Sequence, residues 1–354
     1  MLRYLSFSVF SLLLFSHCTQ EKPDIRVVCE TMSSGSYKIK WETFPPIDGT
    51  VKIFESTVPD SFNLSLPIAE TDIKNNFKDI FNIQSNKRSY FKLVFNKNQS
   101  VVTAERTIPM QGLFNFRDLG GYYTTNGELI KWGKLYRSSS LSNATLQDAK
   151  VLADLGIKTV IDLRAEYERY SEPPRFRASR IYNFPLRGNP SHVYADAVFS
   201  GRIRAGDARI YLQDIFYSLL EYNYDFFEQI FDILLDTDNY PVLISCSAGS
   251  DRSAVAAALV LAALDIDMEQ IISDYMLTNE QTDLSLYLPF MNEIYSQDSG
   301  VQETFTTLYR MHRGTITYSF EKIIKEYESL DNFFATALKL NPEKREKLKK
   351  ILLD

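Results

Sequence analysis

The stretch that most constrains the fold is Pro241–Leu264, with the sequence PVLISCSAGSDRSAVAAALVLAAL. An apolar run that predicts a buried strand ends at Cys246, a loop of small residues follows, and Ser253–Leu264 predicts an apolar helix. Strands of this kind belong to mostly parallel sheets covered by helices. The loop after Cys246 would then lie at the carboxyl edge of the sheet, where open α/β folds bind their ligands.

Other segments continue the alternation of helices and strands. Residues 141–157 predict a helix, residues 158–164 a buried parallel strand, and residues 209–236 an aromatic-rich helical region. Residues 315–354 predict two or three further helices. We therefore expect residues 111–354 to form one α/β domain around a central, mostly parallel sheet flanked by helices.

The segment 25–110 has a different pattern, with short strand signals separated by turn sequences such as SSG, PPIDG and NKNQ. It predicts a small all-β sandwich resembling immunoglobulin or fibronectin type III modules, with Trp41 and Tyr90 in its core. No group of reactive side chains stands out there, so a spacer or interaction module is expected. A chain of 354 residues is long enough for these two domains.

The first residues resemble a bacterial lipoprotein signal. Arg3 precedes the apolar run Leu5–Phe15, which is too short to span a membrane as a mature helix, and Cys18 follows it. The resemblance implies that residues 1–18 are a signal peptide, that Cys18 is lipidated, and that residues 19–24 are a tether. The protein would then be anchored by lipid at the periplasmic face or the cell surface, although plain secretion or an uncleaved anchor stays open.

Composition restricts the partners. The formal net charge of −6 offers no basic face for nucleic acid. His192 and His312 are isolated, and no cluster of His, Cys and carboxylates has metal-ligand spacing, so no metal or other cofactor is expected. If Cys18 carries lipid, Cys29 and Cys246 remain in different predicted domains, which argues against a disulfide.

The loop after Cys246 has the parts of a phosphate site. Backbone N–H groups at the start of a helix have no intrahelical partner, and together with the helix dipole they favour a bound anion. Gly249 lets the chain curl closely, and Arg252 supplies a planar fork for phosphate oxygens. These charges also favour a Cys246 thiolate as nucleophile, with Ser253 donating to the sulfur. A structural cysteine at a strand end is the alternative.

The order of several motifs resembles one bacterial branch of the tyrosine-specific phosphatases. The loop CSAGSDRS spans Cys246–Ser253, and the upstream element NFRDLGGY spans Asn115–Tyr122. Family-like stretches lie between them, at Gly133–Ser142 and Leu155–Glu168. The resemblance covers about residues 112–354 and implies a cysteine-phosphatase fold and hydrolysis of phosphomonoesters through a cysteinyl-phosphate intermediate.

The resemblance also implies roles for single residues. Cys246 would be the nucleophile, Arg252 would bind phosphate and stabilise the transition state, and Asp251 would be the general acid. Asp118 is the fallback acid or a phosphate-contacting residue, with a structural pair with Arg117 as its alternative. The remaining residues expected to bind phosphate are Ser247, Ala248, Gly249, Ser250 and Ser253.

Two positions depart from the family pattern. Ser245 stands where the family has His before the cysteine, and Ser250 stands where the branch has Lys. Losing the lysine lowers the positive charge at the site and favours phosphotyrosine or a similar monoester over polyphosphorylated lipids. A weakly active phosphate- or phosphoprotein-binding module, and a phosphoinositide or dual-specificity phosphatase, remain alternatives. A rhodanese-like sulfur carrier is disfavoured by Arg252 and the upstream motif.

Three further features stay secondary. We expect Arg137 and Arg164 to form buried ion pairs, the latter with Glu168. Residues 186–210 are rich in arginine and predict either a lid over the pocket or a surface loop.

Overall fold

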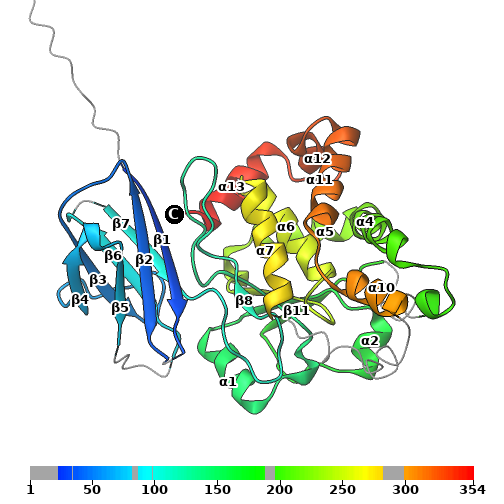
Figure 1. Ribbon diagram of the computed structural model, residues 1–354, viewed down its shortest axis with the longest axis horizontal. Coiled ribbons are helices and arrows are strands. Elements are labelled where there is room, and N and C mark those ends of the chain that lie inside the picture. The colour runs from blue at the N-terminus through cyan, green and yellow to red at the C-terminus, as the bar shows by residue number, and fades with distance from the viewer. Residues whose placement is uncertain (1–22, 34, 82–86, 98, 188–195, 282–298) are drawn as a thin grey trace, which may run out of the picture.

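A computed structural model describes residues 23–33, 35–81, 87–97, 99–187, 196–281 and 299–354. The predicted signal, with Cys18, lies outside the described residues, as does His192. Figure 1 shows two bodies side by side, an all-β unit followed in the chain by a larger unit of helices around a sheet.

The N-terminal unit consists of two antiparallel sheets, with the strand orders β1-β2-β5 and β4-β3-β6-β7. Alternate residues of the first strand, Ile25, Val27 and Cys29, face the core between the sheets, as period-two patterning requires. Trp41 is buried there and its indole Nε1 donates to the carbonyl of Ile73 at 2.8 Å. The strands are β1 (Asp24–Thr31), β2 (Tyr37–Phe44), β3 (Thr50–Ser56), β4 (Ala69–Asp72), β5 (Phe77–Ile80), β6 (Tyr90–Phe95) and β7 (Gln99–Ala104).

The second unit has a five-stranded sheet in the order β11-β10-β12-β9-β8. Its first four strands are parallel, and the short β8 pairs antiparallel with β9 at the edge. The predicted α/β class with a mostly parallel sheet is therefore confirmed. The strands are β8 (Arg117–Asp118), β9 (Leu135–Ser138), β10 (Thr159–Asp162), β11 (Arg180–Asn183) and β12 (Val242–Ser245).

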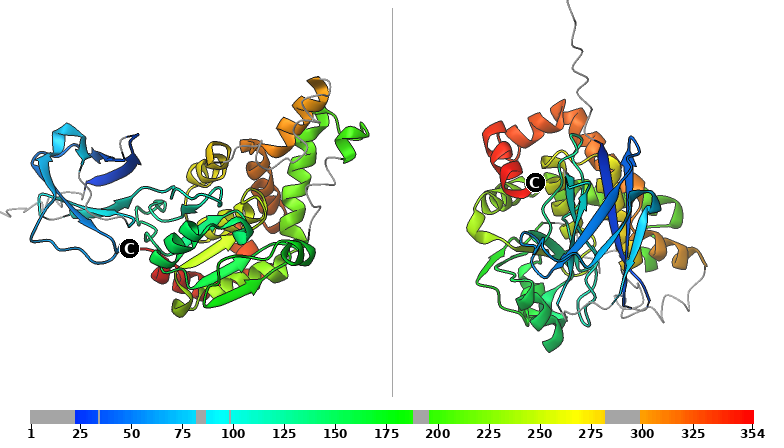
Figure 2. Two further views of the ribbon diagram at one scale, coloured as in Figure 1. Left: turned by 90° about the horizontal axis from the view of Figure 1, so that it is seen from below. Right: turned by 90° about the vertical axis from the view of Figure 1, so that its left-hand side faces the viewer.

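Helices cover this sheet, as the turned views of Figure 2 show. Among the described residues they are α1 (Leu146–Asp154), α2 (Glu166–Ser171), α4 (Ala205–Glu221), α5 (Tyr224–Leu234), α6 (Arg252–Ala263), α7 (Met268–Gln281), α10 (Ser299–Tyr309), α11 (Arg313–Tyr327), α12 (Leu330–Thr336) and α13 (Pro342–Leu352).

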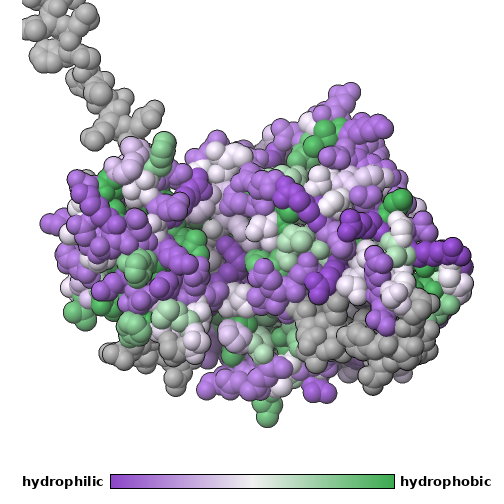
Figure 3. Space-filling model, in the orientation of Figure 1, coloured by the Kyte–Doolittle hydropathy of each residue, from purple (hydrophilic) through white to green (hydrophobic). Residues whose placement is uncertain are grey.

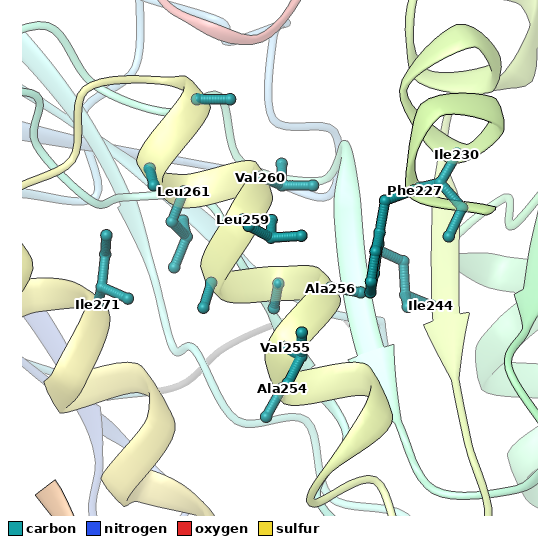
Figure 4. Close-up of a cluster of buried hydrophobic side chains, with 14 of the residues drawn as sticks. Phe227, Ile230, Ile244, Ala254, Val255, Ala256, Leu259, Val260, Leu261 and Ile271 are labelled. Carbon is teal, nitrogen blue, oxygen red and sulfur yellow. The ribbon is translucent and has the colours of Figure 1, made fainter. Parts of the chain in front are cut away.

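Helix α6 is the centre of the packing. Its residues from Ser253 to Ala263 are all buried, which explains a sequence without a polar face. In Figure 4 its side chains lie between Ile271 of α7 on one side and Ile244 of β12 with Phe227 of α5 on the other. The many alanines leave little side-chain bulk, so neighbouring elements can pack closely against α6.

Local signals explain where several other helices begin and end. The side chains of Thr145 and Asp148 form a reciprocal capping box at the start of α1. The predicted helical region over 209–236 consists of two helices, α4 and α5. They break at Asn223, whose buried amide donates to the carbonyls of Leu219 and Arg187. A side chain satisfying backbone groups in this way replaces the hydrogen bonds that a continuous helix would make.

The two units meet along a seam. Arg26 lies over the ring of Tyr123 at 4.0 Å, and the indole of Trp132 donates to the carbonyl of Val102 at 2.9 Å. Tyr90 is buried in this seam together with Trp132, so its predicted place in the sandwich core is wrong. A cleft of about 1130 Å³ follows the seam, and its lining includes none of the predicted site residues.

The face shown in Figure 3 is mostly hydrophilic, with apolar side chains in small separate groups. Within the described ranges, no helix has both the length and the apolar character needed to cross a membrane.

Candidate active site

Strand β12 carries Cys246 to the middle of the sheet's carboxyl edge. The strand is paired with β10 on one side and β9 on the other, and its four residues are buried. It ends at Ser245, and α6 begins at Arg252, so the residues between them form the loop over the cysteine. Two parallel neighbours and a buried helix therefore hold the two ends of this loop.

The backbone of the loop is the first indication of an anion site. Among the described residues, the N–H groups of residues 247–251 find no hydrogen-bond acceptor. These unpaired donors lie directly before α6, whose N-terminus carries partial positive charge. A loop that gathers several N–H groups without acceptors at the start of a helix is suited to bind an anion.

Cys246 lies at the base of this loop and is 2 % exposed. Its Sγ is 3.4 Å from the hydroxyl oxygen of Ser253, the second residue of α6. The hydroxyl can donate to the sulfur when the cysteine is a thiolate. The predicted pair of Cys246 and Ser253 is thus brought together by the strand–loop–helix geometry.

Gly249 gives the loop its shape. Its φ is +74°, and a Cβ at this position would lie 2.6 Å from the backbone nitrogen of Ser139 and 2.8 Å from the carbonyl carbon of Ser138. Its own carbonyl accepts from the Asn115 amide at 2.6 Å and from Arg137 Nη2 at 2.8 Å. No side chain fits here, and the two donors fix the orientation of the Gly249 peptide carbonyl.

A buried charge network supports the donors to Gly249. Asp274 of α7 pairs with Arg117 Nε of β8 at 2.9 Å and with Arg137 Nη1 of β9 at 2.8 Å. The hydroxyl of Tyr122 donates to the same carboxylate at 3.0 Å. Burial alone would raise the pKa of Asp274, but the two arginines hold it well below its usual range. One ionised carboxylate thus orients two arginines behind the loop.

Arg252 is held by a second carboxylate. Its Nη1 and Nη2 donate to the two oxygens of Glu168 at 2.6 and 2.9 Å, and Nη2 also donates to the Ser247 hydroxyl at 2.7 Å. Burial would raise the pKa of Glu168, but the hydrogen bonds and charge of Arg252 lower it to about 2. The predicted pair of Glu168 with Arg164 is therefore wrong, because Arg164 binds Asp162 at 2.8 Å instead.

Asp251 lies at the N-cap of α6, yet its side chain makes no capping hydrogen bond. Burial raises the pKa of its carboxyl above the usual 3.8, against the opposing charges of Arg252 and Arg137. A carboxyl that keeps its proton more strongly than usual, at the edge of an anion site, has the property required of a general acid.

Asp118 does not belong to this group. It is completely buried, and its oxygens accept from Arg88 Nη1 at 2.6 Å and from the backbone of Gly120 and Gly133. Because neighbouring residues of a strand face opposite sides, Asp118 faces away from its neighbour Arg117 and from the loop. Its predicted contact with phosphate is therefore not found. The predicted pair of Asp118 with Arg117 is replaced by Asp118 with Arg88 and Arg117 with Asp274.

Ser247, Ala248 and Ser250 lie in the loop and are partly exposed. Of the predicted lid, residues 188–195 lie outside the described part of the chain. Arg187 binds Asp225 at 3.0 Å and the Tyr222 carbonyl at 2.9 Å, so its guanidinium is engaged at the start of α5.

In this α/β unit a central parallel strand ends at a cysteine, and a loop of N–H groups without acceptors follows it. An arginine held by a carboxylate lies beside that loop. This combination is typical of the active site of a phosphoric monoester hydrolase. Comparison of sequences gives the family. Residues 108–354 match the profile of the Tyrosine phosphatase family, and the chain belongs to this family.

Individual relatives agree. A putative tyrosine-protein phosphatase of Cupriavidus necator is 26 % identical over 257 residues, which cover 68 % of this chain and 87 % of the relative. The triple specificity protein phosphatase PtpB of Mycobacterium tuberculosis is 28 % identical over 200 residues, covering 50 % of this chain and 70 % of that protein. A tyrosine-protein phosphatase of Nostoc commune is 28 % identical over 148 residues, covering 40 % and 47 %.

Among solved structures, the core catalytic domain of the PP-IP phosphatase Siw14 from S. cerevisiae has a TM-score of 0.27 at 15 % identity, covering 54 % of this chain and 97 % of that domain. TpbA of P. aeruginosa has a TM-score of 0.24 at 15 % identity, covering 51 % and 89 %. These scores are too low to assign a fold.

The shape of the loop can be tested at Gly249. We expect Gly249→Ala to lower the melting temperature and abolish binding of inorganic phosphate, because the new methyl group meets the backbone of Ser138 and Ser139. Gly156→Ala is the control, since its φ is +69° but a Cβ there meets nothing within 4 Å. Both variants lose about 1–2 kcal/mol to the left-handed backbone. Calorimetric titration with phosphate should separate them, and equal phosphate affinity in the two would contradict the close fit.

The ion pair of Glu168 predicts a pH dependence. A carboxyl whose pKa falls from 4.5 to about 2 on folding stabilises the protein by on the order of 3 kcal/mol, at about 1.4 kcal/mol per pKa unit. This contribution is complete above pH 4.5 and is lost as the pH falls towards 2. Urea unfolding should therefore show Glu168→Gln less stable than wild type at pH 7, with the gap narrowing at pH 3. The exposed Glu166 of the same helix provides the control Glu166→Gln. A gap independent of pH would reject the ion-pair explanation.

Proposed function

We propose that this phosphatase hydrolyses phosphotyrosine, in a protein or as a similar small monoester, through a covalent intermediate on Cys246. The observation that carries the proposal is the loop itself. Its unpaired N–H groups and the guanidinium of Arg252 follow Cys246 in one short loop, which supports a role in binding the three terminal oxygens of a phosphate next to the sulfur.

In the first step the thiolate sulfur of Cys246 attacks the phosphorus, an S–P bond forms, and the bond from phosphorus to the ester oxygen breaks. Asp251 gives its proton to that oxygen, so the phenol leaves neutral. In the second step water attacks the phosphorus, Asp251 takes a proton from the water, and the S–P bond breaks. The Ser253 hydroxyl, 3.4 Å from the sulfur, stabilises the departing thiolate. Inorganic phosphate is released.

Arg252 is prepared for this chemistry before substrate arrives. Its guanidinium is fixed by Glu168 and Ser247, so little side-chain entropy remains to be lost on binding. Positive charge that is already in place stabilises the negative charge of the transferring phosphoryl group more effectively than a mobile side chain does.

The preference for a monoester follows from the charges of the loop. Between Cys246 and Ser253 the one cationic side chain is Arg252, because Ser250 supplies a hydroxyl instead of an ammonium group. A single phosphate dianion is matched by this arrangement, whereas a polyphosphorylated inositol lipid would leave further charges without partners. Initial rates on phosphotyrosine, phosphoserine and phosphothreonine peptides and on inositol lipids would decide the substrate class, and a preference for the lipids would reject phosphotyrosine.

The nucleophile can be tested with the two described cysteines. We expect the full chain and its Cys29→Ser variant to release nitrophenol from p-nitrophenyl phosphate, because Cys29 is buried in the sandwich core. Cys246→Ser should lose all measurable turnover, since no S–P bond can form. Equal rates for Cys246→Ser and wild type would refute the assignment. Phosphate binding without turnover in wild type would favour the binding-module alternative.

The general acid has its own signature. Asp251→Asn should slow phenyl phosphate more than p-nitrophenyl phosphate, because the poorer leaving group depends more on proton donation. Since the pKa of Asp251 is raised, kcat in wild type should fall as the pH rises through that value, and this limb should vanish in the variant. Steady-state rates from pH 4 to 8 provide the measurement. The same slowing for both esters would exclude Asp251 as the acid.

A further inference from the structure

The two faces of the β8–β9 pair contact different parts of the protein. The register places Arg117 opposite Arg137, and Asp118 opposite Tyr136. Because residues alternate across a strand, the two arginines share one face and the other two residues share the opposite face. The arginine face holds Asp274 and the carbonyl of Gly249, as described above. The opposite face is turned towards the N-terminal sandwich.

Arg88, just before β6 of the sandwich, reaches this opposite face. Its Nη1 donates to Asp118 Oδ2 at 2.6 Å and to the Tyr136 hydroxyl at 3.2 Å. Its Nη2 donates to the carbonyl of Glu105 at 2.8 Å, which ties the same guanidinium to the end of the sandwich. The Arg88 side chain is 9 % exposed and the Asp118 side chain is not exposed at all.

A second arginine from the sandwich side reinforces the contact. Arg106 Nη1 donates to the carbonyls of Asp118 and Gly120 at 3.0 and 2.7 Å, and its guanidinium lies 3.7 Å from the ring centre of Tyr122. The hydroxyl of that tyrosine donates to Asp274. Both arginines therefore contact the segment that supports the phosphate loop from behind.

The charge of Asp118 makes this contact important. Without Arg88 the buried carboxylate would keep backbone N–H donors but lose the ion-pair partner that the described residues give it, and removing one partner of a buried ion pair is strongly unfavourable. The edge strand β8 would then move or admit water to relieve the charge. The family match begins at residue 108, so Arg88 and Arg106 both lie outside the part of the chain that the family shares.

We infer that Arg88 is a positioning residue for the active site. From the N-terminal module it fixes β8 through Asp118, and β8 with β9 in turn fixes the arginines that shape the loop around Gly249. The sandwich is thus a structural part of the phosphate site. The inference rests on the proposed function for its activity readout, while its binding and exchange readouts are independent of turnover.

The experiment compares Arg88→Met and Arg88→Lys with Arg26→Met in the full chain. Arg26 is the control for loss of an arginine contact across the seam, because it lies over an aromatic ring of the second unit with its side chain 42 % exposed, but it does not contact β8. Three quantities are measured well below the melting temperature. They are the dissociation constant of inorganic phosphate by calorimetry, kcat and KM for p-nitrophenyl phosphate, and hydrogen exchange of the Ser139 amide, which bonds to the Phe114 carbonyl beneath the loop.

Arg88→Met should weaken phosphate binding about three- to thirty-fold, the range in which residues distant from a site modulate it. It should lower kcat as well as raise KM, and it should speed exchange at Ser139. Arg88→Lys keeps the charge but cannot bridge Asp118 and Glu105 equally well, so it should fall between Arg88→Met and wild type. Arg26→Met should leave phosphate affinity, kcat and exchange unchanged.

The inference is overturned if folded Arg88→Met, or Arg88→Lys where Met does not fold, binds phosphate and protects Ser139 as wild type does. It is also overturned if Arg26→Met causes the same loss, because then any loosening of the seam would suffice. A wild-type chain that binds phosphate without turnover would refute the proposed function but leave the binding and exchange comparison intact.

Discussion

The candidate active site depends on the ion pairs that the Asp274 carboxylate makes with two buried arginines. This carboxylate joins α7 to β8 and β9 by binding Arg117 and Arg137 in a fully buried environment. An ion pair exposed to water contributes little to stability. A buried charge without a partner is strongly unfavourable, so α7, β8 and β9 are held in the arrangement that pairs all three charges. Since Arg137 also binds the carbonyl of Gly249, the same constraint determines the curvature of the loop.

The sequence predicted the parts that are local. The loop, its cysteine and its arginine lie within thirteen residues, and apolar periodicity was enough to place them between a buried strand and a buried helix. Two strands of the sandwich, β4 and β5, have the short sequences AETD and FKDI. Four residues are too short to show a clear alternation in the sequence, and pairing with neighbouring strands decides their structure instead.

Partners of buried charges could not be predicted in the same way. Arg164 has several carboxylates within four residues of it, and sequence alone does not choose among them. The predicted partner was Glu168, whereas the structure pairs Arg164 with Asp162. Asp274 has no local feature that marks it, because its partners are more than a hundred residues distant along the chain. Asn115 was visible within the upstream motif, but its bond to Gly249 depends on a left-handed backbone at φ 56° that the residue type only permits.

The backbone conformation of Gly249 has a consequence for how such a site can change over time. In the proposed mechanism, phosphate is bound by main-chain N–H groups, one glycine and one arginine, while Ala248 and Ser250 are partly exposed and Ser247 is bonded to Arg252. Phosphate binding and substrate selectivity therefore depend on different atoms of the same loop, Cys246–Ser253. New side chains at Ala248 and Ser250 can alter which ester is accepted while the ion pair of Arg252 with Glu168 stays in place, so one scaffold can serve successive substrates while its reaction stays the same.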